Sequence, residues 1–135
     1  MAAPREAAQG FPPRLRLRRT ADYRRVQRRG RRHHSELFVT VYAANGLGHP
    51  RFGLTVSRKV GNAVTRNQVK RWLREAIRRH PAAHDRSLAG TDVVFIARSR
   101  AAGVGFAAVQ VAVADAFNAV LRGRQPYAPP ACPGA

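Results

Sequence analysis

Apolar residues recur at helical spacing in two long segments of the chain. In residues 63–80 and 106–121 they stand three or four positions apart, which predicts amphipathic helices with one buried face. The two stripes are Val69, Trp72, Leu73, Ala76 and Ile77, and Phe106, Val109, Val113, Phe117, Val120 and Leu121. Pro81 ends the first helix and Gly123 ends the second.

A shorter helix is predicted over residues 21–29, with Thr20 as its N-cap and Gly30 as its stop. Strands are predicted where β-branched and aromatic residues cluster, at 37–43, 51–57 and 93–97. Asn45-Gly46 marks a turn, so the second strand is expected to return beside the first. Residues 31–36 are a candidate short edge strand. The aromatic residues expected in the core are Phe38, Tyr42, Phe52, Trp72, Phe106 and Phe117.

This order of elements predicts an α+β fold, a two-layer sandwich in which helices cover one face of a mixed sheet. Residues 1–13 and 125–135 are rich in Ala, Pro and Gly, so we expect two disordered tails around one domain, residues 14–124.

Charge indicates the class of partner. The chain has 25 Lys and Arg against 7 Asp and Glu, a formal net charge of +18. Such an excess repels itself in the folded state and is typical of proteins with a polyanionic partner. All but two of these cations, Lys59 and Lys70, are arginines, whose planar guanidinium binds phosphate through two hydrogen bonds. A genome rich in G and C would also favour arginine over lysine, but it would not set the sign of the charge.

Other classes are disfavoured. No stretch approaches the roughly 20 apolar residues of a membrane span, and residues 1–13 lack the apolar region of a secretory signal. We therefore expect a cytoplasmic protein without a membrane partner. Cys132 is the only cysteine, which rules out an internal disulfide and disfavours zinc. His33 and His34 are adjacent on an extended segment, so they point to opposite faces rather than to one metal. The acidic residues form no evident pair for acid–base catalysis.

The candidate chemistry lies where the second strand leads into the first long helix. Arg58 and Lys59 end the strand, a Gly-Asn turn follows, and the helix opens beside Arg66 and Asn67. Helix N-termini attract phosphate, and flanking arginines strengthen that attraction. Residues 66, 70, 74 and 78 place their charges in one row. A solvated helix face is the alternative, but Glu75 is the only counter-charge on this helix, which favours binding.

Residues 52–78, FGLTVSRKVGNAVTRNQVKRWLREAIR, resemble the signature of the bacterial ribonuclease P protein family. The likeness extends to residues 15–23 and 92–98 and covers about residues 14–124. It implies an α-β-β-β-α-β-α fold (ribosomal protein S5 domain 2-like) with a left-handed βαβ crossover, contrary to the usual hand.

The resemblance also implies a division of labour within an endoribonuclease. The family's RNA subunit hydrolyses the phosphodiester with bound Mg²⁺, and the protein subunit binds that RNA and the 5′ leader of precursor tRNA. On this basis the chain has no catalytic residue and no metal ligand of its own, and no DNA partner is expected. The implied contacts with the RNA subunit are Arg58, Lys59, Arg66, Asn67, Gln68, Lys70, Arg71 and Arg74. The implied leader cleft, between the N-terminal helix and the sheet, comprises Tyr23, Gln27, Val39, Val41 and Arg51.

Three positions depart from the family pattern. Gln68 replaces a basic residue, Gln27 stands where many relatives have an aromatic, and Val41 replaces a cleft aromatic. The last two weaken base stacking, so leader binding is expected to depend more on charge. Tyr23 is either a stacking platform or a packing residue by its sequence context, and the resemblance favours stacking.

Two other classes of nucleic-acid-binding protein are alternatives. A non-catalytic RNA-binding protein, such as a ribosomal protein or RNA chaperone, fits the charge and fold class equally well. A DNA-binding protein would require a helix with varied base-reading side chains, whereas this helix presents a nearly uniform basic row.

Overall fold

The computed structural model describes residues 13–123. The predicted order of helices and strands is confirmed in this part of the chain. The long elements are α2 (Thr20–Arg29), β1 (Arg31–His34), β2 (Phe38–Ala44), β3 (Arg51–Thr55), α3 (Ala63–Arg79), β4 (Thr91–Ala97) and α4 (Phe106–Gly123). Three 3₁₀ turns accompany them: η1 (Pro13–Leu15), η2 (Pro81–Ala83) and η3 (Ser99–Ala101). The predicted tails lie almost wholly outside the described residues.

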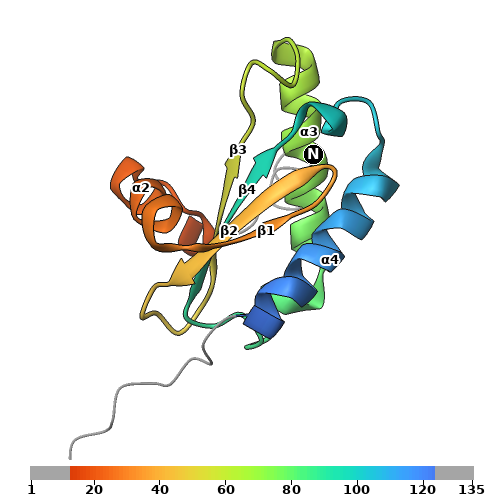
Figure 1. The fold of residues 1–135 in the computed structure, drawn as a ribbon. Coiled ribbons are helices and arrows are strands. Elements are labelled where there is room, and N and C mark those ends of the chain that lie inside the picture. Colours follow the sequence, from red (N-terminus) through yellow and green to blue (C-terminus); the bar gives the residue numbers. More distant parts are fainter. Residues whose placement is uncertain (1–12, 124–135) are drawn as a thin grey trace, which may run out of the picture.

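The four strands form one mixed sheet in the order β1-β2-β4-β3 (Figure 1). β2 runs antiparallel to both β1 and β4, whereas β3 runs parallel to β4. The expectation that residues 51–57 return beside residues 37–43 is therefore wrong. β4 lies between them, because this strand is apolar on both sides and all but one of its residues are buried. At the centre of the sheet, β4 can have both of its faces covered by helices.

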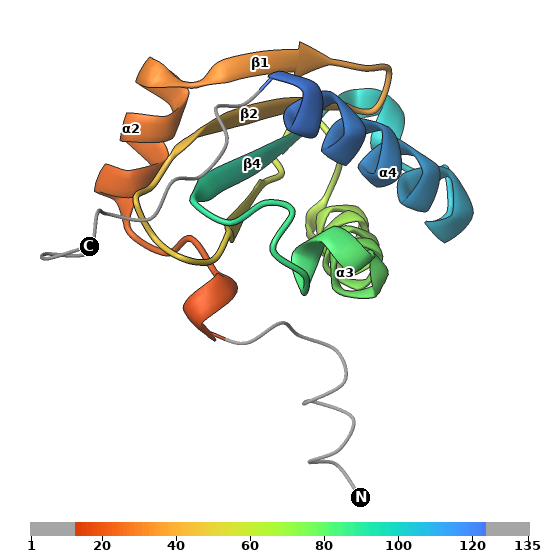
Figure 2. The same ribbon diagram turned by 90° about the horizontal axis from the view of Figure 1, so that it is seen from below.

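Helices cover the two faces of the sheet unequally. α3 and α4 pack together on one face, over a core that includes Phe38, Phe52, Phe95 and Phe117. α2 lies on the opposite face and packs on β2 and β4 (Figure 2). The predicted α+β class is confirmed, but the helices do not all lie on one face. Alternate residues of β2 and β4, among them Val41, point away from α3 and α4 and need a cover of their own.

The connection from β3 through α3 to β4 joins two parallel strands. It is the predicted βαβ crossover, and its left-handed sense remains a prediction. It places the start of α3 next to the strand ends at Thr55 and Ala97, since Ser99 Oγ donates a hydrogen bond of 3.2 Å to the carbonyl of Lys59. The basic loop before α3 is thereby tied to the chain that follows β4.

Several local predictions need correction. Thr20 is the first residue of α2 rather than its cap; Arg19 occupies the cap position and makes no side-chain hydrogen bond there. Trp72 and Phe106 lie at the edge of the core and are only partly buried. Phe38, Tyr42, Phe52 and Phe117 are buried as predicted.

α4 is the one helix within residues 13–123 that is long and apolar enough to cross a membrane, with a mean hydropathy of 1.2 over 18 residues. Its buried stripe, which includes Val109, Val113 and Phe117, packs against α3 and the sheet. This packing is that of a core helix, and the composition of α4 follows from it.

Candidate nucleic-acid interface

The start of α3 is built by a capped turn. Asn62 is the N-cap, and its side-chain oxygen accepts a hydrogen bond of 2.9 Å from the Thr65 amide. Before it, the amide of Gly61 donates to the carbonyl of Arg58 at 3.2 Å, which closes the loop. A side chain at position 61 would lie 2.9 Å from a Thr65 methyl, so glycine allows this close approach. Arg58 and Lys59 are exposed on the loop, beside the free amides of the helix start.

The first three turns of α3 carry an unneutralised basic surface. We name Arg66, Lys70 and Arg74 the α3 basic row; they stand four residues apart, hence on one side of the helix. None of the three side chains forms a hydrogen bond or ion pair with another residue of the described chain, and the Nε of Arg66 is a buried atom without a partner. Asn67 and Arg71 are exposed beside the row, whereas Gln68 is exposed on another side of the helix. The positions implied for α3 by the resemblance, apart from Gln68, thus share one broad side of the helix.

Glu75 ends this unneutralised surface. It accepts hydrogen bonds from Arg78 Nε at 3.0 Å, from Arg78 Nη2 at 2.6 Å and from Arg79 Nε at 2.6 Å. These bonds, the Arg78 ones foremost, hold the pKa of Glu75 below its usual value. The guanidinium of Arg79 also lies 5.2 Å from the ring centre of Phe106. The row predicted to include residue 78 therefore stops, as a set of unpaired cations, at Arg74.

On the other face of the sheet, α2 packs on the strands through Tyr23 and Val26. The ring of Tyr23 lies against Gly53, where an added Cβ would be 2.7 Å from three atoms of the ring and hydroxyl. The hydroxyl oxygen of Tyr23 accepts a hydrogen bond of 3.2 Å from the Leu54 amide. Burial raises the pKa of Tyr23, against smaller opposite effects from that hydrogen bond and from the charge of Arg74.

The residues expected to line a cleft beside α2 fall into two groups. Val41 is fully buried under Val26, so it cannot form part of an accessible surface, and that assignment is corrected. Its burial follows from the position of α2 directly over the middle of β2. Val39 is only partly buried and Gln27 is exposed. Of the hydrophobic positions on this face of β2, Val39 is the one closest to the uncovered end of the sheet.

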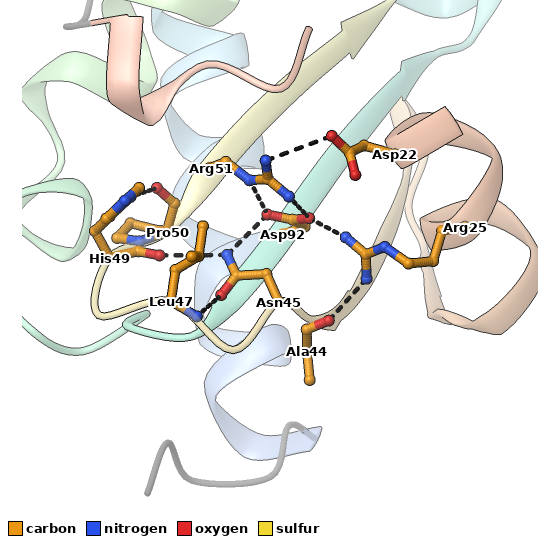
Figure 3. Close-up of polar contacts among 9 residues, drawn as sticks. All are labelled: Asp22, Arg25, Ala44, Asn45, Leu47, His49, Pro50, Arg51 and Asp92. Carbon is orange, nitrogen blue, oxygen red and sulfur yellow. Dashed lines mark hydrogen bonds and ion pairs between the residues drawn. The ribbon is translucent and has the colours of Figure 1, made fainter. Parts of the chain in front are cut away.

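Arg51 is engaged by carboxylates. Its Nε and Nη2 donate to the two oxygens of Asp92 at 2.9 and 2.8 Å, and its Nη1 lies 3.4 Å from Asp22 (Figure 3). Asp92 also pairs with Arg25 and accepts from Asn45 Nδ2 at 2.8 Å. We name Asp22, Arg25, Asn45, Arg51 and Asp92 the Asp92 cluster. Its fully buried carboxylate links β4 to β3 and α2, so the role of Arg51 here is to hold α2 on the sheet.

An open groove of about 490 Å³ extends from the uncovered end of this sheet face. Its lining residues are Glu36, Ser57, Lys59, Ile96, Ala97, Arg98, Ser99 and Arg100. Ile96 pairs with Val39 in the sheet register, and both side chains are only partly buried. The groove therefore begins at these two apolar side chains. Arg98 is exposed and its guanidinium lies 3.3 Å from His34 Nδ1.

Comparison with known proteins shows the family to which the chain belongs. A family model described as ribonuclease P matches residues 11–121. The chain is 37% identical over 94 residues to the ribonuclease P protein component of Syntrophus aciditrophicus, covering 70% of this chain and 76% of that protein. The chain belongs to the ribonuclease P protein family.

Further relatives show how far the likeness to this family extends. The ribonuclease P protein component of Staphylococcus epidermidis is 31% identical over 114 residues, which cover 79% of this chain and 96% of the relative. Among solved structures, the RNase P protein of Thermotoga maritima superposes with a TM-score of 0.68 at 31% identity, covering 82% of this chain and 98% of the other. The RNase P protein of Staphylococcus aureus gives a TM-score of 0.70 at 29% identity, over 78% and 94% of the two chains.

Two features were not foreseen from the residues. Arg98 and Arg100 border the groove, although the sequence assigned a binding role to neither. Asp92 is the buried centre of an ion-pair cluster; an acidic residue directly before the apolar run of residues 93–97 was the available signal. Within residues 13–123 no three His, Cys, Asp or Glu side chains gather where they could hold a metal ion.

Proposed function

We propose that this chain is the protein subunit of ribonuclease P, which assists the RNA subunit in removing the 5′ leader of precursor tRNA. The observation that carries the proposal is the α3 basic row. Three cations stand on one side of a helix without internal partners, next to a basic loop, in a chain of the ribonuclease P protein family. Such a row matches the repeating phosphates of an RNA backbone.

The RNA subunit is proposed to contact the loop and the first three turns of α3. Arg58, Lys59, Arg66, Lys70, Arg71 and Arg74 supply charge, and Asn67 and Gln68 supply amides that can donate to phosphate. Gln68 replaces a cation of the family pattern, so each remaining cation carries a larger share of the binding. Glu75 sets the limit of this contact because it neutralises the last turn of the helix.

The precursor's leader is proposed to lie along the sheet face beside α2 and into the groove that ends at Arg98 and Arg100. Val39 and Ile96 offer an apolar floor, and Lys59 and Arg98 offer charge at its far end. Tyr23 is half-buried with its hydroxyl engaged, so only part of its side chain is available to a bound base. Leader binding should then depend strongly on salt, since phosphate contacts contribute more to it than stacking.

The bond-breaking step is assigned to the RNA subunit. Catalysis by the protein would require a positioned acid–base pair or nucleophile. Of the described acidic residues, four are engaged with arginines, Asp85 accepts a hydrogen bond from the Ser87 amide, and Asp115 is exposed. Mg²⁺ is proposed to be held by the RNA subunit and substrate, because the described side chains do not fit a magnesium site. The protein's contribution is to neutralise phosphates so that two RNAs approach each other. We expect it to act in the cytoplasm.

The proposal is tested by the affinity of the reconstituted holoenzyme for precursor tRNA compared with mature tRNA. The protein should strengthen binding of the precursor but not of the mature tRNA, and Arg98→Ala should reduce that difference. Arg122→Ala, an exposed cation on α4, is the matched control. Equal effects on both tRNAs would favour the alternative, a general RNA-binding protein without a leader site.

A further inference from the structure

A second basic site lies at the opposite end of the sheet from the loop before α3. There the end of α2, the start of β1 and the end of α4 meet, and a pocket of about 350 Å³ opens between them. It is lined by Arg25, Arg29, Arg31, Tyr42, Ala43, Ala44, Gly90, Thr91 and Gly123. The pocket shares no residue with the α3 basic row or with the groove at Arg98.

Two of the three arginines are held in place by the fold. Arg25 donates to the carbonyl of Ala44 at 2.8 Å and pairs with Asp92 (Figure 3). Its side chain is 30% exposed. Arg31 donates to the carbonyl of Gly123 at 2.9 Å. Each guanidinium has five N–H donors, so both keep donors available for a ligand. Because their positions are fixed before any ligand arrives, binding would cost little side-chain entropy.

The charge of this pocket is not balanced from within. The side chain of Arg29 forms no hydrogen bond or ion pair with any residue of the described part of the chain, and no acidic residue lines the pocket. The nearest carboxylate, Asp92, is shared among Arg25, Arg51 and Asn45. Three guanidinium groups around a small concavity, with one shared counter-charge, form a site for an anion with several oxygen atoms.

We propose that this pocket is a second phosphate-binding site and that its ligand is a backbone phosphate of an RNA strand. The inference rests on the proposed function, since it assumes an RNA partner. Guanidinium donors match the geometry of phosphate oxygens. The pocket is too small for a duplex but suits one phosphate with its sugar. An exposed arginine on β1, Arg32, continues the positive surface outside it, as a strand with repeating phosphates requires.

The site can be tested on the full chain by NMR with two probes, inorganic pyrophosphate and a short oligouridine. Both should shift the Nε–Hε signals of Arg29 and Arg31 and the amide of Thr91. The oligonucleotide should bind with the steeper salt dependence. Loss of one single-strand phosphate contact lowers the slope of log K against log salt by about 0.7. If the two proteins bind equally at 1 M salt, a slope lower by about 0.7 makes the variant's binding about fivefold weaker at 0.1 M salt.

Variants give the deciding comparison. Arg29→Ala and Arg31→Ala should each weaken oligouridine binding about fivefold and reduce the slope, whereas Arg28→Ala, on the same helix but outside the pocket, should change affinity by less than about twofold. Equal effects of Arg28→Ala and Arg29→Ala would overturn the site. Binding of pyrophosphate without any effect of the variants on oligouridine would show an adventitious anion site and overturn the RNA assignment. Stimulation of cleavage by the unaltered chain would, in either case, leave the proposed function standing.

Discussion

Removal of the Asp92 carboxylate should destabilise the protein more than any other change of an acidic residue. Asp92 is fully buried and receives four N–H donors, two from Arg51 and one each from Arg25 and Asn45. In Asp92→Ala these donors lose their acceptor and two guanidinium groups remain largely desolvated.

The magnitude follows from how much water the two arginines can recruit. Breaking a fully buried ion pair by deleting one partner costs about 3–5 kcal/mol. The side chains of Arg51 and Arg25 are 21% and 30% exposed, so partial hydration places the cost at the lower end, about 3 kcal/mol. For a domain of this size that corresponds to a fall in melting temperature of roughly 12 °C. Asp92→Asn keeps the shape of the side chain but loses its charge, so its melting temperature should lie between those of Asp92→Ala and the unaltered protein.

The assay is urea and thermal unfolding of the RNA-free protein, followed by circular dichroism. Asp115→Ala removes an exposed carboxylate from α4 and is the matched control, with an expected change within about 0.5 kcal/mol. A double-mutant cycle with Arg51→Met should give a coupling free energy of about 2 kcal/mol, because the two side chains are in direct contact. A loss below about 1 kcal/mol in Asp92→Ala would refute the view that this cluster holds α2 on the sheet.

Three further predictions concern the interface and its support. Glu75→Gln should free Arg78, strengthen binding of the RNA subunit a few-fold and steepen its salt dependence. Gly53→Ala should displace Tyr23 and destabilise the fold by about 1–3 kcal/mol, whereas Gly48→Ala, with open space around it, should not. Burial lowers the pKa of His80, so the free energy of unfolding should be highest above pH 6.5 and should decrease as pH falls through 6.5 toward the folded-state pKa.

Each of these has a result that would contradict it. If neutralising Asp115 strengthened binding of the RNA subunit as much as Glu75→Gln does, the effect would come from net charge and not from the release of Arg78. For Gly53, an unchanged melting temperature would show that Tyr23 is free to move. His80→Asn keeps an acceptor that could serve the Ala82 amide but removes the titrating ring, so its stability should be less sensitive to pH between 7 and 5. A variant with the same pH profile as the parent would exclude His80 as the cause.

The elements of the fold were predictable because each is a local pattern. The stripes of α3 and α4 and the apolar run of β4 give their positions within a few residues. Strand order was not predictable, since Asn45-Gly46 is compatible with a hairpin. The observed order arises from burial of β4 on both faces, a property of the whole sheet.

The candidate site shows the same division between local and long-range properties. The α3 basic row follows from four-residue spacing, but the neutralisation of Arg78 and Arg79 depends on which side-chain rotamers Glu75 can reach. Val41 and Arg51 were assigned to a surface, yet one is buried and the other is engaged with Asp92. Both outcomes depend on where α2 lies, and no spacing within the chain specifies that.

The central claim is that the chain supplies binding and charge to a reaction performed by its RNA partner. The most direct measurement is cleavage of a 5′-labelled precursor tRNA at low Mg²⁺ concentration by a bacterial ribonuclease P RNA, with and without the protein. We expect no cleavage by the protein alone, accurate cleavage when it joins the RNA, and weaker stimulation by Arg74→Ala than by Arg122→Ala. Cleavage by the protein without RNA, or an RNA reaction that the protein leaves unchanged, would contradict it.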